Sequence, residues 1–86
     1  MRNQLERSGA SIGANIREAN YAQSRADFIS KLQIALKECF ETEYWLELFM
    51  RAGLAEEFVV QPLLQQGGSI RRMLIASVNT AKSKTD

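Results

Sequence analysis

Carboxylates on the predicted helices are the side chains of this sequence that come nearest to a catalytic or metal-binding set. Glu18, Glu41 and Glu43 lie in the first two apolar-periodic segments, and carboxylates are ligands for hard cations. Di-iron helical bundles need a Glu-x-x-His motif on each of two helices, but the sequence contains no histidine. We therefore expect no cofactor, and a small-ligand or metal site on these three carboxylates is kept as the alternative.

Two side chains could act as nucleophiles, Ser11 and Cys39. Neither has a histidine base, since the chain has none, and a nucleophile of this kind needs an adjacent base or a lowered pKa. Cys39 lies within an apolar helical pattern, which predicts a buried thiol with a raised pKa. The sequence therefore indicates no catalytic residues and a protein that is not an enzyme.

A row of polar side chains runs along the first helical segment beside an apolar row. At 3.6 residues per turn, the polar row consists of Gln4, Arg7, Ser8, Ser11, Asn15 and Glu18. Glu43 falls inside the apolar arc of the second segment, where an unpaired carboxylate is costly. We expect Arg7 or Asn15 to meet it in a polar clasp that fixes the helix register. The alternative is a carboxylate of raised pKa in a cleft.

Apolar residues recur at three- and four-residue steps along the chain, without strand-like alternation and with a single proline. The 86 residues predict one all-α domain, an elongated up-and-down bundle over residues 1–86. Its predicted helices cover about residues 3–19, 24–52 and 56–82. Ser24 is the expected N-cap of the second helix, and Gly53 is expected to end it. Pro62 is expected to bend or restart the third.

The second helix carries apolar residues on the side opposite its main apolar seam. These residues are Ile34, Trp45 and Leu48. Helices that are apolar on two sides are usually buried on two sides, so this strip is a candidate subunit interface with Trp45 as its anchor. Scattered surface hydrophobic residues, which are normal when taken singly, are the alternative.

Eleven basic and ten acidic residues leave a net charge of +1, too balanced for the field that non-specific nucleic-acid binding requires. Basic residues of the third helix and its tail are the candidate nucleic-acid contact, and a solvated face is the alternative. This basic set is Arg71, Arg72, Lys82 and Lys84. No apolar run approaches the roughly 20 residues of a membrane span, and the single cysteine favours a reducing compartment. We therefore expect a cytoplasmic protein without a membrane partner.

Short motifs follow one another from the start of the chain to the end of the second predicted helix. They are Gln4-x-x-Arg7, Ser11-Ile12-x-x-Asn15-Ile16-x-Glu18, Ser24-x-x-Asp27-Phe28, Ile34-Ala35-Leu36 and Glu41-x-Glu43-x-x-Leu46-Glu47-Leu48. Their order and spacing resemble the four-helix-bundle proteins named for intervening sequences in 23S rRNA genes. The resemblance implies a small bacterial protein that assembles as a homo-oligomer, in some members a pentamer. It also implies a polar core made of Arg7, Ser11, Asn15, Glu18, Glu41 and Glu43, without catalytic residues.

The chain departs from that family in two places. Members usually have another amphipathic helix before the Gln4-x-x-Arg7 segment, and only three residues precede it here. We therefore expect three long helices, with the family's first helix missing or supplied by a neighbouring chain. Ala19-Asn20 also replaces the glycine common after the motif's glutamate, so Asn20 is expected to take any left-handed position in the turn.

These observations lead to one functional hypothesis and one alternative. The hypothesis is a non-enzymatic, self-associating helical bundle that acts as an accessory or scaffold for a nucleic-acid or protein partner. A related bundle, the accessory protein of diversity-generating retroelements, binds nucleic acid and a reverse transcriptase. The alternative is a small-ligand or metal-binding bundle that uses Glu18, Glu41 and Glu43.

Overall fold

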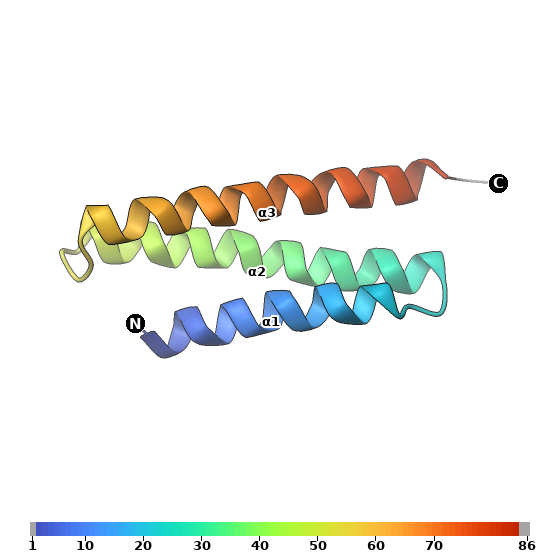
Figure 1. The fold of residues 1–86 in the computed structure, drawn as a ribbon, viewed down its shortest axis with the longest axis horizontal. Helices are drawn as coiled ribbons and strands as arrows, with labels where there is room; N and C mark the ends of the chain where they lie inside the picture. The colour runs from blue at the N-terminus through green and yellow to red at the C-terminus, as the bar shows by residue number, and fades with distance from the viewer. Residues whose placement is uncertain (1, 85–86) are drawn as a thin grey trace.

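The computed structural model describes residues 2–84, and all regular structure within them is helical (Figure 1). The helices are α1 (Arg2–Asn20), α2 (Arg25–Arg51) and α3 (Glu57–Ser83). Each observed boundary lies within one residue of the predicted one. The all-α prediction is therefore confirmed over the described residues, because apolar periodicity at 3.6 residues per turn is a local property that a sequence displays directly.

Both predicted caps of α2 are present. The Ser24 hydroxyl accepts a hydrogen bond from the Asp27 backbone N–H at 3.0 Å, which satisfies one of the free donors of the first turn. At the other end Gly53 has φ 75°, and the Leu54 N–H donates to the Phe49 carbonyl at 2.8 Å. This is a Schellman ending, which favours glycine because a side chain in the left-handed region is strained.

Two local expectations need correction. α3 does not restart at Pro62, which lies inside the continuous helix from Glu57 to Ser83, and a bend at Pro62 stays a prediction. Pro62 is near the start of α3, so it removes one backbone hydrogen bond there, and packing against α2 holds the remainder. Among the described residues only Gly53 has a positive φ, so Asn20 takes no left-handed conformation; it is the last residue of α1.

α2 is the central helix, and α1 and α3 lie on its two sides (Figure 1). The chain runs up, down and up along an elongated body of 50 × 21 × 14 Å. α1 and α3 each pack against α2 but do not pack against one another. The molecule is therefore an open three-helix layer rather than a closed bundle, and the missing family helix stays a prediction.

The core lies along α2, where α1 and α3 each pack against it. Its buried side chains are Ala19 of α1, Leu32, Ala35 and Cys39 of α2, and Leu74 and Val78 of α3. Ile12 and Ile16 from α1 and Ile70 from α3 pack against this cluster and stay partly exposed. Because α1 and α3 each pack against α2 and not against one another, the structure has two separate seams, α1–α2 and α2–α3.

Candidate functional site

A groove between α1 and α2 gathers part of the predicted polar row. It has a volume of about 320 Å³. Its lining residues are Gln4, Arg7, Ser8 and Ser11 of α1 with Glu38, Glu41 and Trp45 of α2. Two carboxylates, one guanidinium and two hydroxyls thus face one space. Such a set is suited to binding polar groups.

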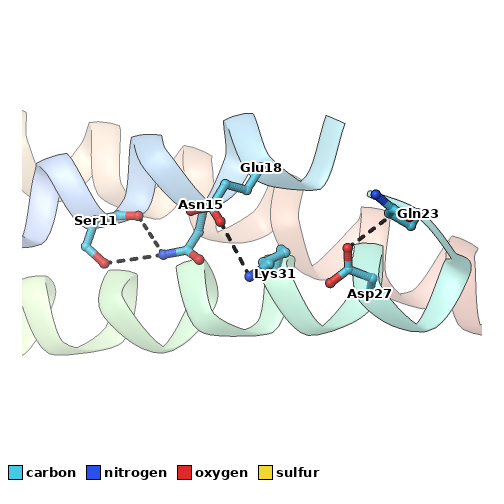
Figure 2. Close-up of polar contacts among 6 residues, drawn as sticks. All are labelled: Ser11, Asn15, Glu18, Gln23, Asp27 and Lys31. Carbon is cyan, nitrogen blue, oxygen red and sulfur yellow. Dashed lines mark hydrogen bonds and ion pairs between the residues drawn. The ribbon is translucent and has the colours of Figure 1, made fainter. Parts of the chain in front are cut away.

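Asn15 is satisfied within its own helix. Its side-chain amide donates to the Ser11 carbonyl oxygen at 2.9 Å and to the Ser11 hydroxyl oxygen at 3.4 Å (Figure 2). Residues four apart share a helix face, so this contact needs nothing from α2. The prediction that Asn15 or Arg7 meets Glu43 is therefore wrong for Asn15, and Arg7 is an exposed residue that lines the groove instead.

Glu18 connects the end of α1 to the start of α2. Its Oε1 lies 3.4 Å from the Lys31 Nζ (Figure 2). One turn of α2 nearer the loop, the Asp27 carboxylate accepts a hydrogen bond from the Gln23 backbone N–H at 3.4 Å. Both contacts are partly exposed to water, so each contributes little to stability. Both contacts lie at the α1–α2 turn, and the partner of Glu18 there is a lysine of α2.

Glu43 is paired from the opposite side of α2. Its Oε2 lies 2.8 Å from the Nε of Arg71 on α3, and the side chains are 17% and 27% exposed. The same guanidinium carbon lies 5.5 Å from the centroid of the Phe40 ring, within the range of a cation–π contact. The predicted clasp between α1 and α2 therefore does not form at Glu43, and the carboxylate ties α2 to α3 instead.

The antiparallel register of α2 and α3 explains this partner. A Cβ built at Gly67 would lie 3.7 Å from the Glu43 Cγ, so Gly67 lies opposite Glu43. Arg71 is one helical turn beyond Gly67 on the same face, from which its side chain reaches back to the carboxylate.

The six residues expected to form a polar core are divided between two seams. Arg7, Ser11 and Glu41 line the α1–α2 groove, Asn15 and Glu18 lie further along α1, and Glu43 lies against α3. Residues 2–84 contain no group of three or more Cys, Asp or Glu side chains that could hold a metal ion. The carboxylate-site alternative loses its geometric basis, because its three glutamates point to different neighbours.

Two members of the groove were not expected in the polar core. Glu38 lies three residues before Glu41, and Trp45 lies four residues after it, so all three share a helix face. This spacing was available in the sequence, but the neighbouring helix was not. Trp45 is half-buried and stacks on Phe49 with ring centroids 5.8 Å apart. Contacts within the same chain therefore cover part of the expected interface anchor.

The other two residues of the predicted interface strip face outward. Ile34 is 43% exposed and Leu48 is 39% exposed. Phe40 and Tyr44 are also exposed on α2, and Tyr44, four residues before Leu48, extends the same side of the helix. We call Ile34, Phe40, Tyr44 and Leu48 the outer strip. A subunit contact at this strip stays a prediction.

The basic residues of α3 do not form one stripe. Arg71 is engaged with Glu43, and Arg72 donates to the Ser69 hydroxyl at 3.3 Å on the surface. Lys82 lies ten residues after Arg72, which turns it about 80° around the helix. Lys84 lines a second hollow near the end of α3. The expected nucleic-acid contact therefore stays a prediction, and it now depends on Arg72 and Lys82 more than on Arg71.

Cys39 has the environment that the sequence predicted. Burial raises the pKa of its thiol, the nearby carboxylate of Glu43 raises it further, and the Arg71 guanidinium partly opposes this. A thiol held in its protonated form is a poor nucleophile. Cys39 is a core residue that packs with Leu32 and Ala35.

No helix within residues 2–84 combines the length and the apolar character needed to cross a bilayer.

Comparison with known proteins identifies the chain. The family model described as 23S rRNA-intervening sequence protein matches residues 1–76. The chain belongs to that family. The resemblance inferred from the motifs of α1 and α2 is therefore confirmed, and the match continues through most of α3.

A crystal structure similar to this 23S rRNA-intervening sequence family member comes from Bacteroides thetaiotaomicron. It is described as a protein with unknown function from the S23 ribosomal protein family. The two chains are 53% identical with a TM-score of 0.85, and the match covers 88% of this chain and 70% of the other. The comparison with curated proteins gives no match. Neither the family description nor the relative's description names a catalytic activity.

Proposed function

We propose that this chain is a non-catalytic, self-associating helical protein that acts as an accessory or scaffold for a nucleic-acid or protein partner. The observation that carries the proposal is an open three-helix layer whose central helix exposes apolar side chains on the side away from its core. A helix that is apolar on two sides is usually buried on two sides. Membership of the 23S rRNA-intervening sequence protein family is consistent with this role.

The outer strip spans about 120° of the circumference of α2, from Phe40 to Ile34. Phe40, Tyr44 and Leu48 follow one another at four-residue steps, and Ile34 lies about 40° from Leu48 around the helix. Full burial of one large apolar side chain contributes about 1.5 to 3 kcal/mol, and these side chains are already partly covered. Association costs about 4 to 15 kcal/mol in lost motion. The strip alone therefore supports weak association, and a stable assembly requires a second contact.

The expected pentamer sets a condition on that second contact. A five-fold ring contains no two-fold axis, so each repeated contact joins two different surfaces of the chain. The outer strip would then meet a different face of its neighbour rather than its own copy. Native mass spectrometry measures the number of copies directly, and a particle of two copies would contradict the pentamer.

Sedimentation velocity at micromolar concentration tests self-association. The wild type is expected to sediment as an oligomer, and Ile34→Asp with Leu48→Asp is expected to shift it toward monomer, because two carboxylates would be buried in the contact. Gln65→Asp, an exposed change on α3, is the matched control and leaves the distribution unchanged. A wild type that stays monomeric at these concentrations overturns the proposal.

A cytoplasmic location belongs to the same proposal. The support is the single cysteine, which is buried, free and held as a thiol, as is usual in a reducing compartment. Fractionation of cells that express the tagged protein tests it, and recovery from an oxidising compartment would contradict it.

A further inference from the structure

The groove between α1 and α2 contains three charged side chains that do not pair with one another. Arg7 lies on its α1 wall, and Glu38 and Glu41 lie on its α2 wall. Within residues 2–84, none of the three makes an ion pair, although all of them line the same space of about 320 Å³. The groove therefore offers one cationic and two anionic groups to a molecule that enters it.

A nearly buried hydroxyl in the same groove also lacks a partner. Ser8 is 9% exposed and lines the groove, and its hydroxyl makes no hydrogen bond to another described residue. The Ser11 hydroxyl, by contrast, accepts one from Asn15. No fully enclosed side-chain oxygen or nitrogen of residues 2–84 is unpaired, so the Ser8 hydroxyl still opens onto the groove. A polar group this deep needs a hydrogen-bond partner, and a ligand can supply it.

The antiparallel register of α1 and α2 brings these groups to one level. Glu18 meets Lys31 near the turn. Ten residues further from the turn on each helix, Ser8 lies opposite Glu41. Arg7 precedes Ser8 on α1, so a guanidinium, a hydroxyl and a carboxylate lie within one part of the groove. We call Arg7, Ser8, Glu38 and Glu41 the charged section.

Trp45 gives the groove an aromatic end. It lines the groove one helical turn beyond Glu41 and seven residues beyond Glu38, which is about 10 Å along the helix axis. The volume of about 320 Å³ lies at the small end of the range of small-molecule sites, about 300 to 1,000 Å³. The groove thus places a charged section beside an aromatic surface over the length of one small molecule.

We propose that the groove binds a free α-amino acid with an aromatic or other large apolar side chain. The ligand's carboxylate pairs with Arg7, and its ammonium group lies between Glu38 and Glu41. Its side chain extends to the Trp45 indole, where aromatic rings pack favourably. This inference goes beyond the proposed scaffold role and does not depend on self-association.

A zwitterion fits the charges of the groove better than other ligands do. A simple anion would face two carboxylates, and a simple cation would face the Arg7 guanidinium. A hard metal ion takes about six oxygen ligands, and residues 2–84 contain no third carboxylate or thiol that could join these two around a metal. An α-amino acid carries both charges on one carbon atom, so a single molecule can meet both walls.

The fluorescence of Trp45 tests the proposal directly, because the chain has no other tryptophan. Phenylalanine is the probe; phenethylamine lacks its carboxylate, and phenylpropionate lacks its ammonium group. Phenylalanine is expected to change the emission saturably, and each analogue is expected to bind about tenfold more weakly because it loses one charge-assisted contact. The absence of a saturable change with phenylalanine overturns the site. An analogue that binds as tightly as phenylalanine overturns the choice of a zwitterion.

Substitutions in the groove give an independent measurement. Arg7→Gln and Glu41→Gln each remove one charge at an exposed position and are expected to weaken phenylalanine binding about tenfold. The matched control is Glu47→Gln, an exposed carboxylate of α2 that pairs with Arg51, and it is expected to change binding less than about twofold. Circular dichroism is expected to show the same helix content in all three variants. Phenylalanine binding that neither groove variant weakens overturns the groove as the site.

Discussion

At the scale of single residues, the ion pair between Glu43 and Arg71 holds α2 against α3. Its nitrogen–oxygen distance is 2.8 Å and both side chains are mostly covered. A charge-assisted contact in that position is stronger than a surface pair, because less water competes for the groups. The pair fixes the register of the α2–α3 hairpin.

Arg71→Ala is expected to lower the free energy of unfolding by about 1 to 3 kcal/mol, because it leaves a half-buried carboxylate without a partner. Urea denaturation followed by circular dichroism measures the change. Arg51→Ala is the control: Arg51 and Glu47 are 3.8 Å apart and largely exposed, so the expected loss is below about 0.5 kcal/mol. Equal losses in the two variants would show that Glu43 does not depend on Arg71.

Cys39 should make the protein less stable at alkaline pH. Its folded-state pKa is raised, first by burial and then by Glu43, so the unfolded chain loses the thiol proton at a lower pH than the folded chain. The favourable contribution is therefore complete below about pH 8.5, the pKa of an ordinary thiol, and is lost as the pH rises through the folded value.

The measurement compares wild type with Cys39→Ala across this pH range by urea denaturation. The alanine variant loses some core packing at every pH. The stability advantage of the wild type is expected to shrink as the pH rises. An advantage that stays constant to pH 10 would mean that the thiol pKa is not raised.

At the scale of the elements, the glycines of the α2–α3 hairpin have opposite roles. Gly53 ends α2 with φ 75°, a conformation that strains any other residue. Gly67 lies inside α3, where a Cβ would make an ordinary contact at 3.7 Å with Glu43. The first glycine is required by the backbone, and the second is only a weak helix former.

Gly67→Ala is therefore expected to raise the free energy of unfolding by about 1 kcal/mol, the difference in helix propensity. Gly53→Ala is expected to lower it by about 1 kcal/mol, because the left-handed conformation is unfavourable for alanine. Thermal melts of the two variants separate the cases by the sign of the Tm shift. A lower Tm for Gly67→Ala would mean that α3 approaches α2 too closely there for a methyl group.

At the scale of the whole molecule, the charges are nearly balanced and the basic groups of α3 are dispersed. A net charge of +1 gives little long-range attraction for a polyanion. Any nucleic-acid binding by the isolated chain should therefore be weak and local, and assembly would have to bring basic groups of several copies together.

We expect weak RNA binding that falls with salt, and a double variant with Arg72→Ala and Lys82→Ala that binds more weakly with a shallower salt dependence. Each lost phosphate contact lowers the slope of log K against log salt by about 1. Fluorescence anisotropy over a salt series measures both quantities. Arg51→Ala, at the last residue of α2, is the control. Absence of binding at low salt would remove nucleic acid as a direct partner.

Sequence patterns were sufficient for the helices, the Ser24 cap and the Gly53 ending. Each depends on residues within a few positions of one another, so 3.6-residue periodicity and capping chemistry report them directly. Family membership also followed from the order of the motifs, because the segments that form α1 and α2 keep the family's spacing of polar and apolar residues. The buried position of Cys39 followed from the same periodicity.

Partners across helices were not determined by the sequence alone. Glu43 could be recognised as a charge that needs a partner, but only the register of α2 against α3 shows that Arg71 meets it. The same register separates Glu18, Glu41 and Glu43 and places Trp45 in the α1–α2 groove. The physical reason is that helix formation depends on the spacing of apolar residues along one segment. An ion pair or a groove depends on how two helices are placed relative to one another, and the packing of the whole core sets that placement.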